Sequence, residues 1–361
     1  MAKIERVGIL TGGGDAPGLN AVIRRVVLRG LDYGWKMIPI YDGWKGLTNK
    51  GLVGISKAVE LTKERVEEIR GEGGTILYSS RTNPYKKKEE DVEQLKNNFR
   101  TLGLNALIAI GGEDTLGVAK RLNEEGIPVV GVPKTIDNDL SGTDYTFGFD
   151  TAWNIAGELI GNLHTTAKSH HRVLVVEVMG RHAGWITSYA AKKGKADITY
   201  ICEVPIDLGR GCEIIEQRYA KLDMGEHYAI VAVSEGASLP NEGLVSQKVN
   251  EDAAFGHVGL GGIAERLANA IKEKTGKESR HVVLGHLQRA GPPTETDIIR
   301  AETFASYAVE LVKEGRFGYM SRVKDGIFGW VPLGEAVGTL KKVPLELYDK
   351  ENLRPSERLI L

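Results

Sequence analysis

Short apolar runs alternate along the chain with longer stretches in which apolar residues recur at helical spacing. The run Val7–Thr11 ends in glycines, and apolar residues then lie three and four positions apart over Asn20–Leu31, which predicts a strand, a tight turn and a helix. Five further runs have the same character: Ala106–Ile110, Pro128–Val132, Val173–Val178, Ala229–Val233 and Val282–Leu284. This alternation predicts parallel strands joined by crossover helices, and therefore an α/β fold.

The chain is long enough for two such units. A length of 361 residues at roughly 100–200 residues per domain predicts two lobes, each a mostly parallel sheet flanked by helices. We place the boundary near residue 148, which gives lobes 1–148 and 149–361, and we expect a later segment to return to the first lobe. Because ligands of such sheets bind beyond the carboxyl ends of the strands, we expect the active site in the cleft between the lobes.

Charge and cysteine content exclude several classes of protein. The 47 basic and 48 acidic residues nearly cancel, which argues against nucleic-acid and membrane-surface partners, since both need clustered positive charge. Two cysteines cannot form a disulfide framework, so a cytoplasmic protein is the simplest interpretation. No stretch approaches the ~20 apolar residues of a membrane span. Glycine, with 45 residues, is in excess and gathers in clusters at the ends of the apolar runs.

The glycine-rich segment TGGGDAPGLN at Thr11–Asn20 joins the first predicted strand to the first predicted helix. Such a turn lets backbone N–H groups close on a phosphate, and the helix N-terminus adds positive potential. The segment lacks the lysine of a Walker A loop and the third glycine of the dinucleotide fingerprint. A plain tight turn explains the glycines equally well, so two interpretations stay open.

Acidic residues follow two of the predicted strands. Glu113 and Asp114 come directly after a glycine pair and could hold Mg²⁺, although a helix cap formed by Asp114 or its neighbour explains this motif better when it is taken alone. The segment PKTIDND adds Lys134, Asp137 and Asp139 after a buried strand. The two aspartates are two positions apart, so an extended backbone would point both to one side. An Asx turn explains the acidic residues but not the lysine.

Cationic residues dominate the strand ends in the second half of the chain, with Glu235 as the exception: Arg172, Arg181, Arg280, His286 and Arg289. The planar arginine fork suits phosphate, and glutamate suits sugar hydroxyls, although each arginine alone fits a surface ion pair. Four of the eight histidines lie between His164 and His182, but they lack the HExxH spacing, so we do not expect a zinc site.

The chain resembles the 6-phosphofructokinases over about residues 4 to 300, where motifs of that family occur in the family's order: TGGGDAPGLN, IYDGWKGL, GGTILYSSR, IGGEDT, PKTIDNDLSGTDYTFGF, HHRVLVVEVMGRHAG, VSEGA and SRHVVLGHLQRAG. The resemblance implies phosphoryl transfer to the 1-hydroxyl of fructose 6-phosphate, with Mg²⁺ as the cofactor. The first lobe would bind the phosphoryl donor, and the second would bind the sugar phosphate.

The resemblance also implies residue roles. Asp137 would accept the proton of the sugar hydroxyl, and Asp114, Lys134 and Arg181 would complete the catalytic set. The metal would lie at Glu113 and Asp139. The donor would contact Gly13, Gly14, Arg81 and Thr115. The sugar phosphate would contact Thr135, Ile136, Asp137, Arg172, Met179, Gly180, Arg181, Glu235, Arg280, His286, Leu287, Gln288 and Arg289. In the family, two arginines matching Arg172 and Arg280 come from a neighbouring subunit, so we expect a homo-oligomer, either a dimer or a tetramer.

Two charged residues bear on the identity of the donor. Most ATP-using members of the family have glycine at the position of Asp114, and many have it at that of Lys134, so this pair resembles the pyrophosphate-dependent branch. A carboxylate at Asp114 would repel the α-phosphate of ATP, while Lys134 would neutralise the leaving phosphate. We therefore expect reversible transfer from pyrophosphate. The alternatives are an ATP-dependent 6-phosphofructokinase and a non-catalytic phosphometabolite sensor.

Overall fold

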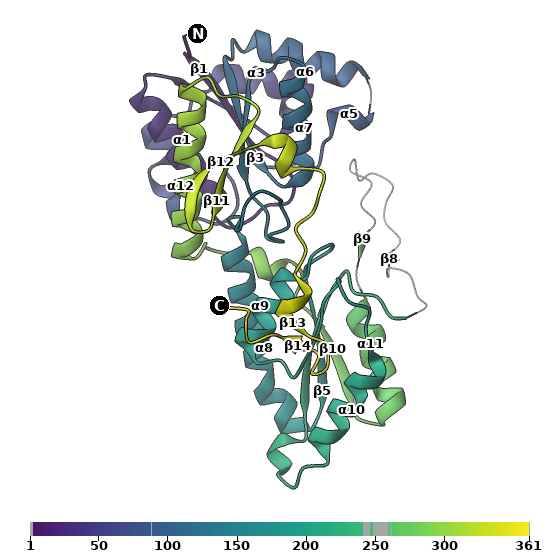
Figure 1. The fold of residues 1–361 in the computed structure, drawn as a ribbon. Helices are drawn as coiled ribbons and strands as arrows, with labels where there is room; N and C mark the ends of the chain where they lie inside the picture. Colours follow the sequence, from purple (N-terminus) through teal and green to yellow (C-terminus); the bar gives the residue numbers. More distant parts are fainter. Residues whose placement is uncertain (1–2, 88, 241–245, 248–258, 261, 361) are drawn as a thin grey trace.

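The computed structural model describes residues 3–87, 89–240, 246–247, 259–260 and 262–360. Two sheets, one in each half of the elongated body, are each covered by helices on both faces (Figure 1). The α/β fold with two lobes of mostly parallel sheet, predicted from the apolar runs, is thus confirmed.

The first lobe is built on a six-stranded sheet in the order β12-β11-β4-β3-β1-β2. Its strands are parallel except for β12, which pairs antiparallel with β11. The strand bounds are β1 Arg6–Thr11, β2 Lys36–Ile40, β3 Ala106–Gly111, β4 Val129–Pro133, β11 Tyr319–Lys324 and β12 Ile327–Pro332.

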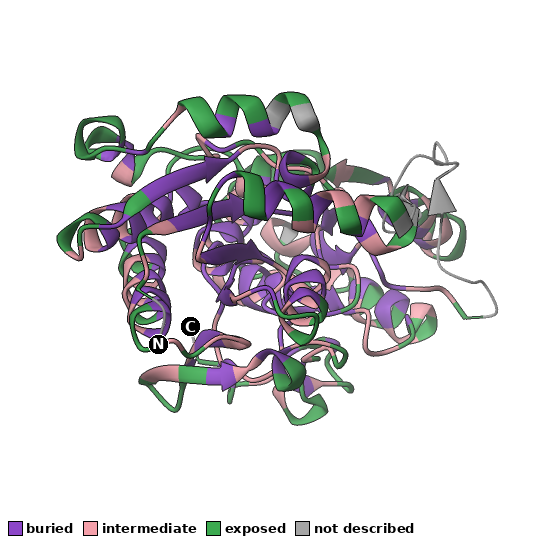
Figure 2. Cartoon of the chain, turned by 90° about the horizontal axis from the view of Figure 1, so that it is seen from above, coloured by how far each residue is buried: buried purple, intermediate pink, exposed green. Residues whose placement is uncertain are grey.

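Helices cover both faces of this sheet, which is why its central strands are apolar without alternation. On one face, the β1 residues Val7 and Ile9 pack with the apolar sides of α1 (Leu19–Asp32) and α12 (Glu295–Lys313). On the other, Leu10 packs with α6 (Glu89–Thr101) and α7 (Glu113–Glu124). Figure 2 shows the resulting distribution, with buried strands inside and exposed residues on the outer sides of the helices.

The second lobe is built on four parallel strands in the order β10-β5-β7-β6. The strands are β5 Val173–Val178, β6 Ile198–Tyr200, β7 Ala229–Ser234 and β10 Ser279–Val283. Its helices are α8 Phe149–His170, α9 Trp185–Gly194, α10 Leu208–Tyr219 and α11 Ile263–Thr275. The predicted run Val282–Leu284 was misplaced, because β10 begins three residues earlier and is a partly exposed edge strand.

The chain passes between the lobes more than once. It leaves the first lobe at α8, returns with α12, β11 and β12, and passes back to the second lobe after α13 (Leu333–Ala336). There the C-terminal segment packs on the sheet, where Tyr348 donates a hydrogen bond of 2.6 Å to the Thr199 carbonyl. The assignment of the first lobe to the donor and of the second to the sugar phosphate stays a prediction.

The remaining elements are short and connect these parts: α2 Trp44–Thr48, α3 Lys50–Ala58, α4 Lys63–Val66, η1 Glu68–Gly71, α5 Pro84–Lys87, η2 Met224–Glu226, β8 Ser246–Gln247, β9 Gly259–Leu260, η3 Gly285–Arg289, η4 Leu345–Leu347, β13 Tyr348–Asp349 and β14 Arg354–Pro355. None of the helices in the described part of the chain combines the length and apolar character needed to cross a bilayer.

Candidate active site

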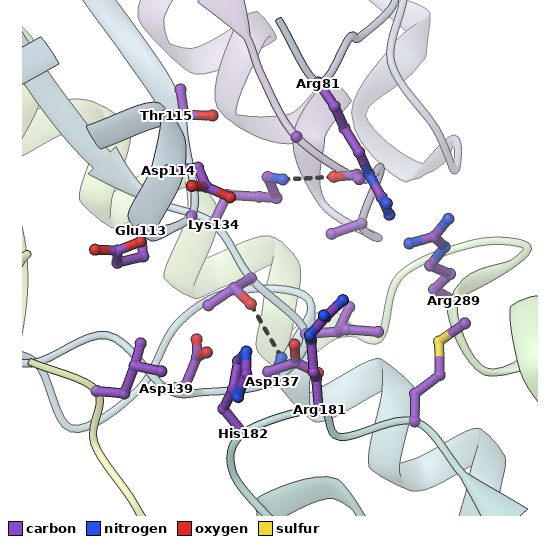
Figure 3. Close-up of a pocket in the computed structure, with 18 of the residues that line it drawn as sticks. Arg81, Glu113, Asp114, Thr115, Lys134, Asp137, Asp139, Arg181, His182 and Arg289 are labelled. Atoms are coloured by element: carbon purple, nitrogen blue, oxygen red, sulfur yellow. Dashed lines mark hydrogen bonds between the residues drawn. The ribbon is translucent and has the colours of Figure 1, made fainter. Parts of the chain in front are cut away.

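A cavity of about 480 Å³ lies where the strand ends of the two lobes face each other. Loops from both lobes contribute to it, and their charged side chains point into one space (Figure 3). The lining comprises Gly13, Gly14, Asp15, Ala16, Arg81, Gly112, Glu113, Asp114, Thr115, Lys134, Thr135, Ile136, Asp137, Asp139, Met179, Arg181, His182, Glu235, Arg289, Gly338 and Leu340.

The glycine turn after β1 forms one wall of the cavity. Its backbone is fixed from the loop before α5, because the Gly13 N–H donates to the Ser80 carbonyl (3.1 Å) and the Ser79 hydroxyl donates to the Gly13 carbonyl (2.6 Å). A Cβ on Gly14 would lie 2.7 Å from Nη1 of Arg289. Glycine at this position therefore lets a guanidinium approach the backbone closely.

Three cationic side chains surround this turn, which makes it suited to a multiply charged phosphate. The Lys134 ammonium donates to the Gly14 carbonyl. The guanidiniums of Arg289 and Arg81 also approach Gly14, at 2.7 and 4.0 Å from the position that a Cβ there would take (Figure 3). Asp15 partly balances this charge, with its carboxylate 3.2 Å from Nη2 of Arg289. Burial and the neighbouring Arg289 lower the pKa of Lys134 to about 8, which is the response expected of cations crowded together in a poorly solvated place.

The N-terminus of α7 forms the next wall. Gly112 is its N-cap, with no side-chain capping bond, so the interpretation of Asp114 or Thr115 as the helix cap was wrong. Glu113 and Asp114 instead occupy the first turn and line the cavity. Thr115, the next residue of this turn, is buried and also lines the cavity. The helix dipole favours negative charge at this end.

The turn after β4 carries two further carboxylates. Asn138 adopts a left-handed conformation (φ 51°) between Asp137 and Asp139, so the prediction of an extended backbone here is wrong. Both aspartates still line the cavity. The Asp137 N–H donates to the Thr135 hydroxyl at 3.1 Å. Burial raises the pKa of Asp137, and the carboxylates of Asp139 and Glu235 raise it further.

The carboxylates of Glu113 and Asp139 suit a magnesium ion that also binds phosphate. Burial raises the pKa of Asp139, and the nearby Glu113 carboxylate adds to this effect, so a cation between the two would be stabilised. Within the described residues, no group of three or more His, Cys, Asp or Glu side chains could hold a metal alone. Mg²⁺ commonly takes one or two carboxylates and completes its shell with waters and substrate phosphates, and this pair fits that pattern.

The second lobe supplies the opposite side of the cavity from the ends of β5 and β7. Met179 and Arg181 follow β5, and Glu235 follows β7, with its backbone N–H bonded to the Val178 carbonyl (2.9 Å). Burial raises the pKa of Glu235. Cationic and carboxylate groups of the second lobe thus face Lys134 and Arg81 of the first lobe across the cavity.

Comparison with known proteins shows the family of this chain. The phosphofructokinase family model matches residues 6–312. The chain belongs to the phosphofructokinase family. A pyrophosphate–fructose 6-phosphate 1-phosphotransferase of Amycolatopsis methanolica is 51% identical over 96% of this chain and 98% of its own. An ATP-dependent 6-phosphofructokinase of Corynebacterium efficiens is 45% identical over 94% of this chain and 96% of its own. The crystal structure of a pyrophosphate-dependent phosphofructokinase from Nitrosospira multiformis has the same fold, with a TM-score of 0.82 and 20% identity, covering 99% of this chain and 90% of that one.

Most residues to which the phosphofructokinase motifs gave a role meet in this cavity, but six do not line it. Arg172 and Arg280 lie outside, where both guanidiniums pair with the Glu278 carboxylate at 3.0 and 2.9 Å. His286 and Leu287 are exposed. The remaining two bond to residues beside the cavity: Gln288 accepts a hydrogen bond from the Met179 N–H at 3.2 Å, and the Gly180 carbonyl accepts one from the Gly236 N–H at 3.2 Å.

The structure also adds six lining residues that had no role assigned from the sequence: Asp15, Ala16, Gly112, His182, Gly338 and Leu340. Four of them stand in motifs quoted above: Asp15 and Ala16 in TGGGDAPGLN, Gly112 in IGGEDT, and His182 directly after Arg181. Gly338 and Leu340 stand in none, because they lie beyond the last matched motif and reach the cavity through the return of the chain between the lobes.

Proposed function

We propose that this phosphofructokinase transfers a phosphoryl group from pyrophosphate to the 1-hydroxyl of fructose 6-phosphate, giving fructose 1,6-bisphosphate and phosphate. The main observation that favours pyrophosphate over ATP as the donor is that Asp114 and Lys134 line the same cavity. Asp114 adds negative charge to the N-terminus of α7, where a longer nucleotide donor would continue, and Lys134 adds positive charge beside Gly14.

We propose that pyrophosphate binds against the glycine turn. It would contact the turn at Gly13 and Gly14, and the cations Lys134, Arg81 and Arg289 would neutralise its charge, which is the main contribution a protein makes to phosphoryl transfer. Thr115 of α7 packs against this turn, where a Cβ on Gly12 would lie 2.6 Å from its Oγ1. Glu113 and Asp139 would hold Mg²⁺, which when bound neutralises phosphate oxygens and orients the transferred group.

Asp137 is the proposed general base. Its raised pKa brings it closer to neutrality, where proton transfer from an alcohol is most effective. As the sugar O1 forms its bond to phosphorus, Asp137 takes the hydroxyl proton. The bridging P–O bond of pyrophosphate breaks, and its electron pair leaves with the departing phosphate. Arg181 would stabilise the charge on the transferred group.

The sugar phosphate would lie on the second-lobe side of the cavity, between the turn after β4 and the ends of β5 and β7. Thr135, Ile136, Met179 and Glu235 would contact the sugar. We propose that Arg172 and Arg280 reach the site of a neighbouring subunit, which their position outside this chain's cavity supports. The chain would then act as a homo-oligomer.

A paired-donor assay tests the proposal. The purified protein is incubated with fructose 6-phosphate and Mg²⁺, with either pyrophosphate or ATP as the donor, and the reverse reaction is followed from fructose 1,6-bisphosphate and phosphate. We expect kcat/KM to be far higher with pyrophosphate and turnover to occur in both directions. Equal or better use of ATP would show the ATP-dependent alternative to be correct, and absence of turnover with both would favour a sensor.

A further inference from the structure

A segment beyond the family motifs, residues 338–341, runs along the cavity as the chain crosses from α13 to the second lobe (Figure 1). The Gly338 N–H donates to Oε1 of Glu113 at 3.3 Å. Three residues later, the Lys341 N–H donates to the Asp139 carbonyl at 2.7 Å. Between them, Leu340 forms an isolated antiparallel bridge with Leu140. The crossing segment 338–341 therefore contacts both proposed metal-binding residues.

The side chain of Lys341 fixes the turn that presents the two aspartates. Its Nζ donates to Oδ1 of Asn138 (3.1 Å) and to the carbonyls of Thr143 (2.9 Å) and Asp144 (2.7 Å). An ammonium has three protons, and each has an acceptor here. Asn138 is the left-handed residue between Asp137 and Asp139, so Lys341 holds the middle of this turn against the loop that follows it.

The crossing segment is anchored in the second lobe as well. The Lys341 carbonyl accepts a hydrogen bond of 3.0 Å from the indole N–H of Trp185, the first residue of α9. Just beyond, the Val343 N–H donates to Oε1 of Glu203 (2.9 Å), and the same carboxylate oxygen accepts from the Gly184 N–H (2.9 Å). The loop 179–184, which carries Arg181 into the cavity, is thus tied to the same stretch of chain.

We propose that Lys341 is a positioning residue for phosphoryl transfer, which holds the Asp137–Asp139 turn in register with Glu113 and with the loop of Arg181. Lys341 is absent from the described residues that line the cavity, so it acts through its neighbours rather than on the reacting atoms. The proposal rests on the phosphotransferase function proposed above. Displacement of a reacting group by 1 Å can cost about 100-fold in rate. Loss of the hydrogen bonds of Lys341 should therefore lower kcat strongly and change the affinity for substrate less.

The test compares Lys341→Met with Lys342→Met, a matched variant at the adjacent exposed residue. For Lys341→Met we expect kcat to fall by about 100-fold, a smaller change in KM for fructose 6-phosphate, and a higher Mg²⁺ concentration for half-maximal rate. Lys342→Met should behave as wild type in all three measurements. Thermal unfolding of each variant confirms that the assayed protein is folded.

Two results would overturn the proposal: a kcat for folded Lys341→Met equal to that of Lys342→Met, or a loss confined to KM. If Lys341→Met does not fold, Lys341→Gln is judged by the same criteria, because its amide keeps two N–H hydrogen-bond donors. The variants are assayed with whichever donor the wild type uses. Exclusive use of ATP would therefore refute the choice of pyrophosphate while the positioning role is still tested, whereas a wild type inactive with both donors would refute both.

Discussion

At the scale of single residues, Asp114 is the position at which donor choice is most directly testable. Two like charges 4 Å apart at an effective dielectric constant of about 20 repel by about 4 kcal/mol, which corresponds to at most about a thousandfold in affinity. Screening by solvent and Mg²⁺ lowers this figure. The carboxylate lies in the first turn of α7 at the cavity wall, so its removal relieves both charge and volume.

We therefore expect Asp114→Gly to gain measurable turnover with ATP, by at most about a thousandfold in kcat/KM over the parent. Asp114→Asn removes the charge but keeps most of the volume, and it should recover only the electrostatic part. Steady-state kinetics with both donors on the three proteins separates the two contributions. An Asp114→Gly variant as inactive with ATP as its parent would contradict this explanation of donor choice.

Lys134 gives rise to a prediction about pH. Its pKa is lowered to about 8 in the free protein, mainly by burial, and only the protonated form neutralises phosphate. We expect kcat/KM, which reports on free-enzyme groups, to fall as pH rises above about 8. Lys134→Arg keeps its charge in this range, so the activity it retains should lack that decline. A wild-type profile that stays flat to pH 10 would be inconsistent with a role for the Lys134 charge.

Site residues could be assigned from the sequence where they lie in a motif directly after a predicted strand. Asp137, Lys134 and Glu113 follow buried strands within contiguous motifs, and the ends of neighbouring parallel strands meet at one edge of a sheet. Lys341 has no such signal. Its place beside Asn138 depends on the return of the chain between the lobes, which local patterns do not encode.

At the scale of elements, local sequence patterns predicted the central strands but not the edge strands. The apolar runs predicted β1, β3, β4, β5 and β7, which are buried on both faces. The edge strands did not follow from the apolar runs. No clear run marks β2, β6 or β12, and the run predicted for β10 begins three residues too late. Edge strands tolerate proline and polar residues because one side makes no ladder bonds, and Pro39 within β2 is an example. β11, an internal strand of mixed composition, was missed as well.

The starts of α8 and α12 meet at a buried carboxylate that joins the lobes. Oδ2 of Asp297 accepts hydrogen bonds from the backbone N–H (2.8 Å) and the hydroxyl (2.7 Å) of Thr151. Asp297→Ala leaves both donors buried without this acceptor, and we expect a loss of about 2 kcal/mol in the free energy of unfolding, measured by urea denaturation. Glu295→Ala, at an exposed ion pair on the same helix, should cost less than about 1 kcal/mol.

This cost should depend on pH, with a defined sign. Burial raises the pKa of Asp297 to about 6, above its unfolded value near 3.8. Between these values the folded state binds more protons, so the contribution of this group to stability grows as pH falls through 6 and shrinks as pH rises. The destabilisation caused by Asp297→Ala should therefore be larger at pH 5 than at pH 7. The reverse order would contradict the raised pKa.

At the scale of the whole molecule, the described chain brings the two lobes together around one cavity but leaves two predicted substrate arginines outside it. Arg172 and Arg280 share the Glu278 carboxylate at the β10 edge of the second sheet. A symmetric dimer could pair along this edge. Arg172 and Arg280 of each subunit would then complete the site of the other subunit.

Hybrid oligomers test this directly. Asp137→Ala lacks the proposed base and Arg280→Ala lacks the proposed partner arginine, so each should be nearly inactive alone. In a mixed dimer, the Arg280→Ala chain keeps its own Asp137 and receives Arg280 from its partner, which restores one of the two sites. After the two variants are unfolded together and refolded at equal concentration, we expect about a quarter of the wild-type activity for random pairing of a symmetric dimer. If Arg280 served the site of its own chain, every site in the mixture would carry a lesion, and activity would stay at the level of the separate variants.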